Sequence, residues 1–369
     1  MTTLTLERPV AATAVDTGII DCDVHPKVRS VADLRPYLSE RWWQHLQTYG
    51  LRARHGFARG MPFPKATPMA CRRDAWPASG GEPGSDLALM REQLLDRYDV
   101  RLGILNPLTP TGQGALNPEF SAAMSRATNR WQIDALVDRE PRLKASIVVP
   151  YEDGALARAE IEHWAGHPGF AQVLLLSRTA EPLGQRRYWP IYEAAAAAGL
   201  PVGIHVFGYS GWPTTGSGWP SFYIEEMTEH AASCQAGINS LIFEGVLERL
   251  PDLKIVVIEA GFAWLPALAW RLDRIWRRNR AEVPYIERPP SEQIRQQVWL
   301  TSQPMEEPEI RSHLTDVVEW LGADRIMFAS DYPHWDFDEP HEALKGIRDP
   351  DIRQKIRCDN AATLFAVRS

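Results

Sequence analysis

The sequence predicts an α/β fold, a TIM-like (β/α)8 barrel spanning residues 17–369. Eight short apolar runs rich in β-branched residues recur along the chain, as in a buried parallel sheet. Runs with helical spacing of apolar residues lie between them, which is typical of consecutive βα units. The length of 369 residues suits either one large barrel or two ordinary domains. The strand count favours the barrel, and an open doubly wound sheet is the alternative.

Both kinds of element follow from local pattern. The predicted strands, each a short apolar run, are Ile19–His25, Arg101–Pro107, Lys144–Tyr151, Phe170–Ser177, Pro201–Gly208, Lys254–Gly261, Gln297–Gln303 and Arg325–Pro333. The predicted helices, each with apolar residues at helical spacing, are Leu87–Tyr98, Pro118–Glu140, Ala155–Ala165, Tyr188–Ala198, Ile238–Leu250, Trp264–Arg278 and Glu309–Leu321.

Two predicted loops are longer than such a barrel requires. Residues 26–85 follow the first strand, and Tyr209–Tyr223 follow the fifth; both are rich in Trp, Gly and Pro. In a barrel both would lie at the carboxyl ends of the strands and wall a pocket. For the middle of the first loop, a solvent loop or a subunit contact is an equal alternative. Residues 1–16 resemble neither a signal peptide nor a membrane anchor, and we expect a disordered tail.

Charge and cysteine content exclude several classes of protein. The formal net charge is −7 with no basic block, so we expect no nucleic acid or anionic membrane as a partner, but a small-molecule substrate. The apolar runs stop short of the ~20 residues that a membrane span needs. The four cysteines lie far apart without CxxC spacing, which argues against a zinc ribbon or a disulfide framework and favours a cytoplasmic protein.

Potential metal ligands stand at the ends of three predicted strands. The first strand ends with Asp23 and His25, the fifth carries His205, and the eighth delivers Asp331. Taken singly, His205 is more often a core histidine, and the aspartates are common turn residues. Carboxylates at the ends of buried strands are costly unless paired or metal-bound, so their convergence favours a metal. These nitrogen and oxygen donors suit zinc first, with manganese or iron as alternatives.

Glu259, at the end of the sixth strand, is the fifth candidate. One interpretation is a general base, or a carboxylate that orients a ligand or a water molecule. The other is a structural ion pair with an arginine such as Arg271. The sequence supports both equally.

Several motifs resemble the amidohydrolase-related family, in the branch that includes the aminocarboxymuconate semialdehyde, γ-resorcylate and carboxyvanillate decarboxylases. The resemblance covers nearly the whole chain beyond the N-terminal tail. The motifs that carry it are Ile19–Pro26, Tyr188–Ala195 followed by Gly203–His205, Phe243–Val246 followed by Arg249–Lys254, Gly261–Pro266, Phe328–Pro333 and Asn360–Phe365. Their order and spacing are specific to the family.

The resemblance implies a distorted barrel, often dimeric, with one divalent metal at the strand ends. The family's metal positions correspond here to Asp23, His25, His205 and Asp331. The resemblance also matches Arg271, and with less support Arg91, to arginines that bind the substrate carboxylate. The chain departs from the decarboxylases in two places. Asp23 replaces the first histidine of a His-x-His pair, and Glu259 replaces a histidine on the sixth strand. A carboxylate is a competent donor at both places.

Three functions are compatible with this site. The first is metal-dependent, non-oxidative decarboxylation of an aromatic or unsaturated acid, with Asp331 or a metal-bound water as proton donor and Glu259 and His334 available for proton movement. The second is hydrolysis or hydration by a metal-activated water. The third is a degenerate, non-catalytic barrel, motivated by the two departures. The aromatic side chains expected to stack on a planar substrate are Trp212, Tyr332 and Trp335.

Overall fold

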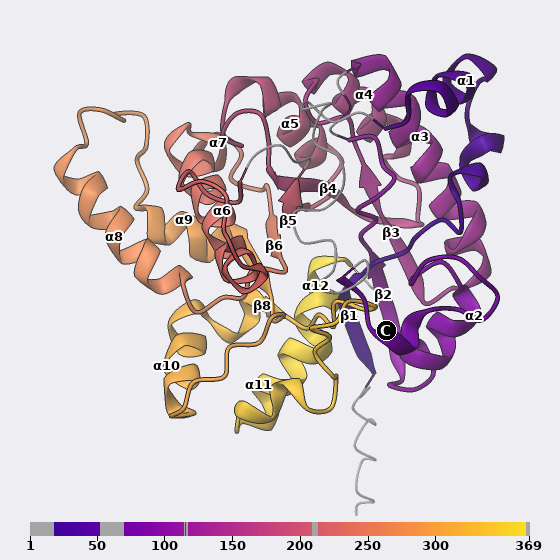
Figure 1. The fold of residues 1–369 in the computed structure, drawn as a ribbon. Helices are drawn as coiled ribbons and strands as arrows, with labels where there is room; N and C mark the ends of the chain where they lie inside the picture. The colour runs from indigo at the N-terminus through magenta and orange to yellow at the C-terminus, as the bar shows by residue number, and fades with distance from the viewer. Residues whose placement is uncertain (1–17, 52–69, 114, 116, 209–212, 367–369) are drawn as a thin grey trace, which may run out of the picture.

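The computed structural model describes residues 18–51, 70–113, 115, 117–208 and 213–366. Its strands form one sheet of eight parallel strands in the order β1 to β8, so the predicted barrel is confirmed. The strands are β1 Ile19–Val24, β2 Val100–Leu105, β3 Leu143–Val148, β4 Phe170–Arg178, β5 Val202–Gly208, β6 Ile255–Ile258, β7 Val298–Thr301 and β8 Ile326–Met327. Each predicted strand overlaps one of these, although β8 ends six residues before the predicted run does. Figure 1 shows the strands at the centre of the molecule with helices around them.

The barrel closes between the first strand and the chain that follows β8. β8 is only two residues long, but the next residues continue alongside β1. Cys22 N–H donates to the Phe328 carbonyl at 3.0 Å, and Asp331 N–H donates to the Asp23 carbonyl at 3.1 Å. This closure places residues 23 and 331, from opposite ends of the sequence, side by side.

Every predicted helix overlaps at least one helix of the structure. The bounds are α1 Glu40–Tyr49, α2 Leu87–Met90, α3 Pro118–Ala135, α4 Gly154–Trp164, α5 Trp189–Ala197, α6 Tyr223–Phe243, α7 Val246–Arg249, α8 Leu265–Arg278, α9 Pro290–Gln297, α10 Ser312–Leu321, α11 Pro350–Gln354 and α12 Asn360–Leu364. Helices α1, α9, α11 and α12 were not predicted, and the prediction began α6 at Ile238, whereas the helix begins at Tyr223. Before Ile238 this helix buries His230, Cys234 and Gly237 instead of large apolar side chains, so the apolar period is weak there.

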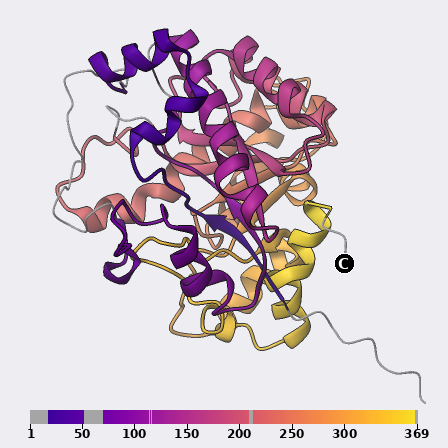
Figure 2. The same ribbon diagram turned by 90° about the vertical axis from the view of Figure 1, so that its right-hand side faces the viewer.

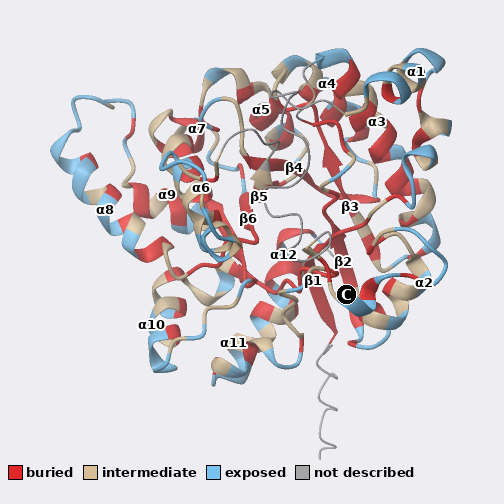
Figure 3. Cartoon of the chain, viewed as in Figure 1, coloured by how far each residue is buried: buried red, intermediate tan, exposed pale blue. Residues whose placement is uncertain are grey.

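The barrel interior has two regions along its axis, an apolar one near the start of the strands and a polar one at their carboxyl ends. An apolar cluster draws residues such as Ile20, Leu102 and Val256 from the early part of the strands, and packs them with Ala361 and Leu364 of α12. Figure 2 shows these C-terminal helices, in yellow, beside β1. Figure 3 shows that the strands are buried while the outer faces of the helices are exposed. Polar side chains are therefore gathered at the carboxyl ends of the strands.

The first long loop returns to this carboxyl end, as expected. Cys71 forms an antiparallel bridge with His334, and Arg72 N–H donates to the Pro333 carbonyl at 3.0 Å. The expected N-terminal tail, residues 1–16, lies outside the described residues. Within the part of the chain that is described, no helix has the length and apolar character needed to cross a bilayer. All four cysteines are buried thiols.

Candidate metal centre

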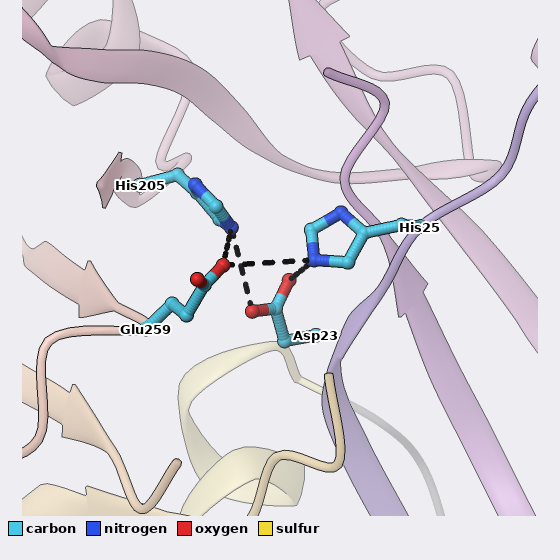
Figure 4. A group of neighbouring side chains, drawn as sticks. All are labelled: Asp23, His25, His205 and Glu259. Carbon is cyan, nitrogen blue, oxygen red and sulfur yellow. Dashed lines mark ion pairs between the residues drawn. The ribbon is translucent and has the colours of Figure 1, made fainter. Parts of the chain in front are cut away.

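Five acidic and imidazole side chains converge at the carboxyl ends of β1, β5, β6 and β8: Asp23, His25, His205, Glu259 and Asp331. Figure 4 shows the first four of them. His25 Nε2 lies 2.9 Å from Asp331 Oδ1 and 3.2 Å from Asp23 Oδ1. His205 Nε2 lies 2.8 Å from Glu259 Oε2 and 3.6 Å from Asp23 Oδ2. Glu259 Oε2 is also 4.0 Å from His25 Nε2, which joins the two halves of the cluster. All five side chains are buried.

Backbone carbonyls fix the orientation of both imidazole rings. His25 Nδ1 lies 2.8 Å from the Asn106 carbonyl oxygen, and His205 Nδ1 lies 2.6 Å from that of Val206. A carbonyl only accepts, so each Nδ1 carries the donated proton. Each Nε2 is then directed at carboxylate oxygens, where only a second proton or a cation can lie between them. This is the arrangement in which histidine binds metals.

Four buried atoms of the cluster that are able to bind a metal have no hydrogen-bond partner: Asp23 Oδ2, His25 Nε2, His205 Nε2 and Glu259 Oε2. Leaving such an atom unsatisfied costs about 1–3 kcal/mol. Ligand atoms of Asp23, His25, His205 and Glu259 all lie within 4.8 Å of one another, as do those of His25, Glu259, Asp331 and His334. One divalent cation would satisfy all four unpartnered atoms at once. The residues present therefore fit a divalent metal bound through nitrogen and oxygen.

The acidic neighbours change the protonation of the cluster. Although burial opposes the charged form, Glu259 and Asp23 raise the pKa of His205 to about 10. Burial raises the pKa of Asp331 to about 6, against the opposing effect of His25. Burial, with the nearby charge of Asp331, also raises the pKa of Glu259. The carboxylates that attract a proton to the imidazoles also attract a metal, so protons and metal compete for the same atoms.

Glu259 belongs to this cluster and not to an ion pair with Arg271. The acid is 4% exposed and contacts His205, whereas Arg271 is exposed on α8. Three residues at the strand ends have left-handed backbones: φ is +77° at Phe207, +58° at Glu259 and +63° at Asp331. Such conformations are rare for residues other than glycine and cluster at functional sites. They turn the chain at the ends of three of the strands that carry the cluster.

Asn106 supports the cluster from the end of β2, and the sequence analysis missed it. Its side-chain amide N–H donates to Asp23 Oδ1 at 2.9 Å, while its backbone carbonyl accepts from His25 Nδ1. Ser146 Oγ and Gln172 Nε2 donate to Asn106 Oδ1 at 2.7 and 3.1 Å, which fixes the amide. The signal was present, because Asn106 is a polar residue near the end of a predicted strand, like the residues that were selected.

We expect Asn106→Ala to weaken binding of added Zn²⁺ or Mn²⁺ by about 10- to 100-fold, because Asp23 loses the donor that orients it. Competition with a chromophoric chelator measures the affinity. Asn279→Ala, at an exposed position at the end of α8, is the matched control and should leave the affinity unchanged. An unchanged affinity in Asn106→Ala would show that Asp23 is held without this amide.

A second acidic group lies beyond Asp331. His334 Nδ1 is 2.6 Å from Asp331 Oδ1, and Gln303 Nε2 is 3.3 Å from both Asp331 Oδ2 and Asp336 Oδ2. Burial, with Asp331 and Glu259 nearby, raises the pKa of Asp336 to about 8. Burial also raises the pKa of Asp338, which accepts from Met305 N–H at 2.9 Å, to about 7.

The shift at Asp338 predicts a pH-dependent stability. Folded Asp338 binds a proton up to about pH 7, whereas in the unfolded chain it releases the proton near pH 3.8. Its contribution to stability is therefore greatest at low pH and is lost as the pH rises through about 7. The free energy of unfolding of Asp338→Asn, relative to that of the wild type, should increase by about 1–2 kcal/mol between pH 5 and pH 8. This value is smaller than the full pKa shift implies because Asp338 is partly exposed to solvent. Urea unfolding at the two pH values measures this, with exposed Asp351→Asn as control; an equal difference at both pH values contradicts it.

Other predicted site residues do not reach the cluster or lie outside the described residues. Arg91 Nε donates to Glu140 Oε2 at 2.7 Å, and Glu140 precedes β3, so this arginine lies at the opposite end of the barrel. The expectation that Arg91 contacts the substrate is thus not supported. A long arginine side chain on a helix pairs with a nearby carboxylate, and the sequence does not show which carboxylate the fold brings close to it. Trp335 is exposed and its indole N–H donates to the Tyr223 hydroxyl at 2.9 Å. Tyr332 is buried, and Trp212 lies outside the described residues.

Comparisons with known proteins agree on one family. A family model described as amidohydrolase matches residues 20–367. The chain is 25% identical over 302 residues to a gamma-resorcylate decarboxylase of Polaromonas sp. strain JS666, covering 76% of this chain and 87% of that protein. A gamma-resorcylate decarboxylase of Rhodococcus jostii strain RHA1 is also 25% identical, over 305 residues, covering 76% and 88%.

Solved structures share the fold. Amidohydrolase map2389c from Mycobacterium avium subsp. paratuberculosis K-10 has a TM-score of 0.73 at 22% identity, covering 95% of this chain and all of that one. For 5-carboxyvanillate decarboxylase LigW from Sphingomonas paucimobilis the score is 0.68 at 20% identity, covering 96% and 100%. A dihydroxybenzoic acid decarboxylase from Polaromonas sp. JS666, with bound manganese and 2-nitroresorcinol, scores 0.64 at 20% identity, covering 96% and 98%.

Proposed function

Because the chain belongs to the amidohydrolase family, we propose that it is a metal-dependent enzyme that decarboxylates an aromatic or unsaturated carboxylic acid without oxidation. The observation that carries the proposal is the convergence of the unpartnered Asp23, His25, His205 and Glu259 donor atoms at the barrel mouth. The curated relatives supply the reaction type, since they are decarboxylases of an aromatic acid.

In this proposal Asp23, His25, His205 and Asp331 hold one divalent metal. Zinc suits these donors, and manganese is the alternative because it is bound in a structural relative. When bound, the metal supplies electrophilic polarisation of the substrate's carboxylate or adjacent hydroxyl. Glu259 lies in the same cluster, 2.8 Å from His205 Nε2, which supports a role for its carboxyl group next to the substrate in this proposal.

The protein's own task is then to move one proton. The bond between the ring or alkene carbon and the carboxylate breaks, carbon dioxide leaves, and the electron pair stays on carbon. A proton from the Asp331 or Glu259 carboxyl group completes the product. His334, whose Nδ1 is 2.6 Å from Asp331 Oδ1, can return the proton to Asp331.

The test is release of carbon dioxide from a panel of hydroxybenzoates and muconate-type acids by the protein loaded with Zn²⁺ or Mn²⁺. We expect stoichiometric carbon dioxide and the protonated product from at least one acid, and none after removal of metal with a chelator. Metal analysis of the purified protein accompanies the assay. Failure to release carbon dioxide from every acid, with one metal bound per chain, would overturn the decarboxylase assignment.

A hydrolase or hydratase is the second candidate, and the placement of Glu259 favours it. A carboxylate among metal donors can take a proton from water, and burial raises the pKa of Glu259 toward neutrality, as a general base requires. Turnover in water labelled with oxygen-18 separates the two reactions. Label in an acid product supports hydrolysis, whereas unlabelled product with carbon dioxide supports decarboxylation.

A further inference from the structure

A second group of polar side chains lies beside the metal centre, at the ends of β4 and β5. Arg178 is the last residue of β4 and pairs in register with Gly208, whereas Leu176 pairs with His205. Arg178 therefore lies one step farther toward the barrel mouth than His205. Helix α6 covers these strand ends, and Ser233 Oγ of α6 lies 2.8 Å from Ser177 Oγ of β4.

His230 projects from α6 toward these strand ends and leaves its polar atoms unused. It is 4% exposed, and its ring centroid lies 4.5 Å from that of Phe207. Neither Nδ1 nor Nε2 has a hydrogen-bond partner. Burial, with Arg178 and His205 nearby, lowers the pKa of His230 to about 3, so near neutral pH the ring offers one donor and one acceptor. Buried polar atoms without a partner are unfavourable, and a ligand group that bonds to them would remove this cost.

Phe207 and Arg178 complete the surroundings of this histidine. The Phe207 ring stacks on His205 at a centroid distance of 6.0 Å and an interplanar angle of 20°, so it neighbours both the metal centre and His230. Its backbone is left-handed, with φ of +77°. The Arg178 guanidinium lies 5.9 Å from the ring centroid, and its charge interacts favourably with Glu226 of α6. An aromatic surface thus lies next to a cation and an unused imidazole.

We propose that Arg178, Phe207 and His230 form a substrate subsite that receives a second acidic oxygen group of an aromatic acid, either a carboxylate or a phenolic hydroxyl. This inference rests on the proposed function, because the first carboxylate is taken to bind at the metal centre. The ring then lies against Phe207, and its second acidic group meets the Arg178 guanidinium and the His230 N–H. The subsite selects aromatic acids with two acidic groups over those with one.

The test compares isophthalate, which has two carboxylates, with benzoate, which has one and carries no phenolic hydroxyl. Calorimetric titration of the metal-loaded protein at pH 7.5 should show at least about tenfold tighter binding of the dicarboxylate. Arg178→Gln and His230→Leu should each bring this ratio close to one. His230→Gln, which keeps a donor and an acceptor, should retain most of it. Arg158→Gln, at an exposed ion pair on α4, is the charge-matched control and should keep the wild-type ratio.

A wild-type ratio near one, or a ratio that Arg178→Gln and His230→Leu leave unchanged, overturns the subsite. Thermal unfolding checks each fold, and if Arg178→Gln does not fold, His230→Leu carries the test because it alters no formal charge near neutral pH. The readout is binding, so its result is separate from the reaction. If the variants lose the binding ratio but no acid releases carbon dioxide, the subsite is supported and the decarboxylase assignment is refuted. If carbon dioxide is released but the variants keep the wild-type ratio, the decarboxylase assignment is supported and the subsite is refuted.

Discussion

His205→Ala is expected to lose the metal and to have an activity at least about 100-fold lower than that of the wild type. The ring supplies one of the four unpartnered ligand atoms, and the other unpartnered nitrogen among them, His25 Nε2, is already in the cluster. Loss of groups that only orient a ligand costs about 10- to 100-fold in affinity, so loss of a ligand should exceed this. Elemental analysis of the purified variant, with turnover at saturating Zn²⁺ or Mn²⁺, measures both effects.

The control for this variant is His163→Ala, which removes an exposed histidine from α4. It should retain the wild-type metal content and rate. Circular dichroism distinguishes loss of the site from loss of the fold, since burying alanine at position 205 leaves a cavity in β5. A folded His205→Ala protein with full metal content would show that His205 is a core residue and not a ligand.

Asp331→Asn is expected to lower kcat by about 10²- to 10⁴-fold, the range for loss of a general acid. Asparagine has nearly the same size, and its carbonyl oxygen can still face His25 Nε2, now 2.9 Å from Asp331 Oδ1. It cannot carry the proton, and it removes one negative charge from the cluster. Metal content should therefore fall less than in His205→Ala, while turnover falls steeply.

The experiment measures kcat, KM and metal content together, with Asp351→Asn on α11 as the control. The expected pattern is a smaller loss of metal than in His205→Ala, a large loss of kcat and little change in KM. Wild-type kcat in a metal-loaded Asp331→Asn protein would remove Asp331 from the chemistry and leave Glu259 as the proton donor.

The sequence predicted the candidate site better than its surroundings. Asp23, His25, His205 and Asp331 were identifiable because each is a charged or imidazole residue at the end of an apolar run, and parallel strands bring those ends together. Glu259 was found for the same reason, although its partner was not. A strand end indicates position but not which neighbour a side chain will meet, so the sequence supported a general base or ligand-orienting carboxylate and an ion pair with Arg271 equally.

What the sequence left out was determined by tertiary contacts. Before Ile238, helix α6 buries small and polar residues, so the apolar period that marks a helix is weak there. The predicted helix therefore began at Ile238 and left His230 outside it. The left-handed backbones at Phe207 and Glu259 have no local sequence signal, since neither residue is glycine, asparagine or aspartate. Arg91 was misplaced because its partner Glu140 is 49 residues away in the chain.

The hydrogen bonds that close the barrel between β1 and the residues after β8 also bear on biosynthesis. Asp23 and His25 leave the ribosome early, whereas Asp331 is translated 306 residues after His25. Until Asp331 and its neighbours have left the exit tunnel, the nascent polypeptide cannot complete the cluster. In the proposed function, the full set of ligands is therefore available to an ion only after the barrel has closed.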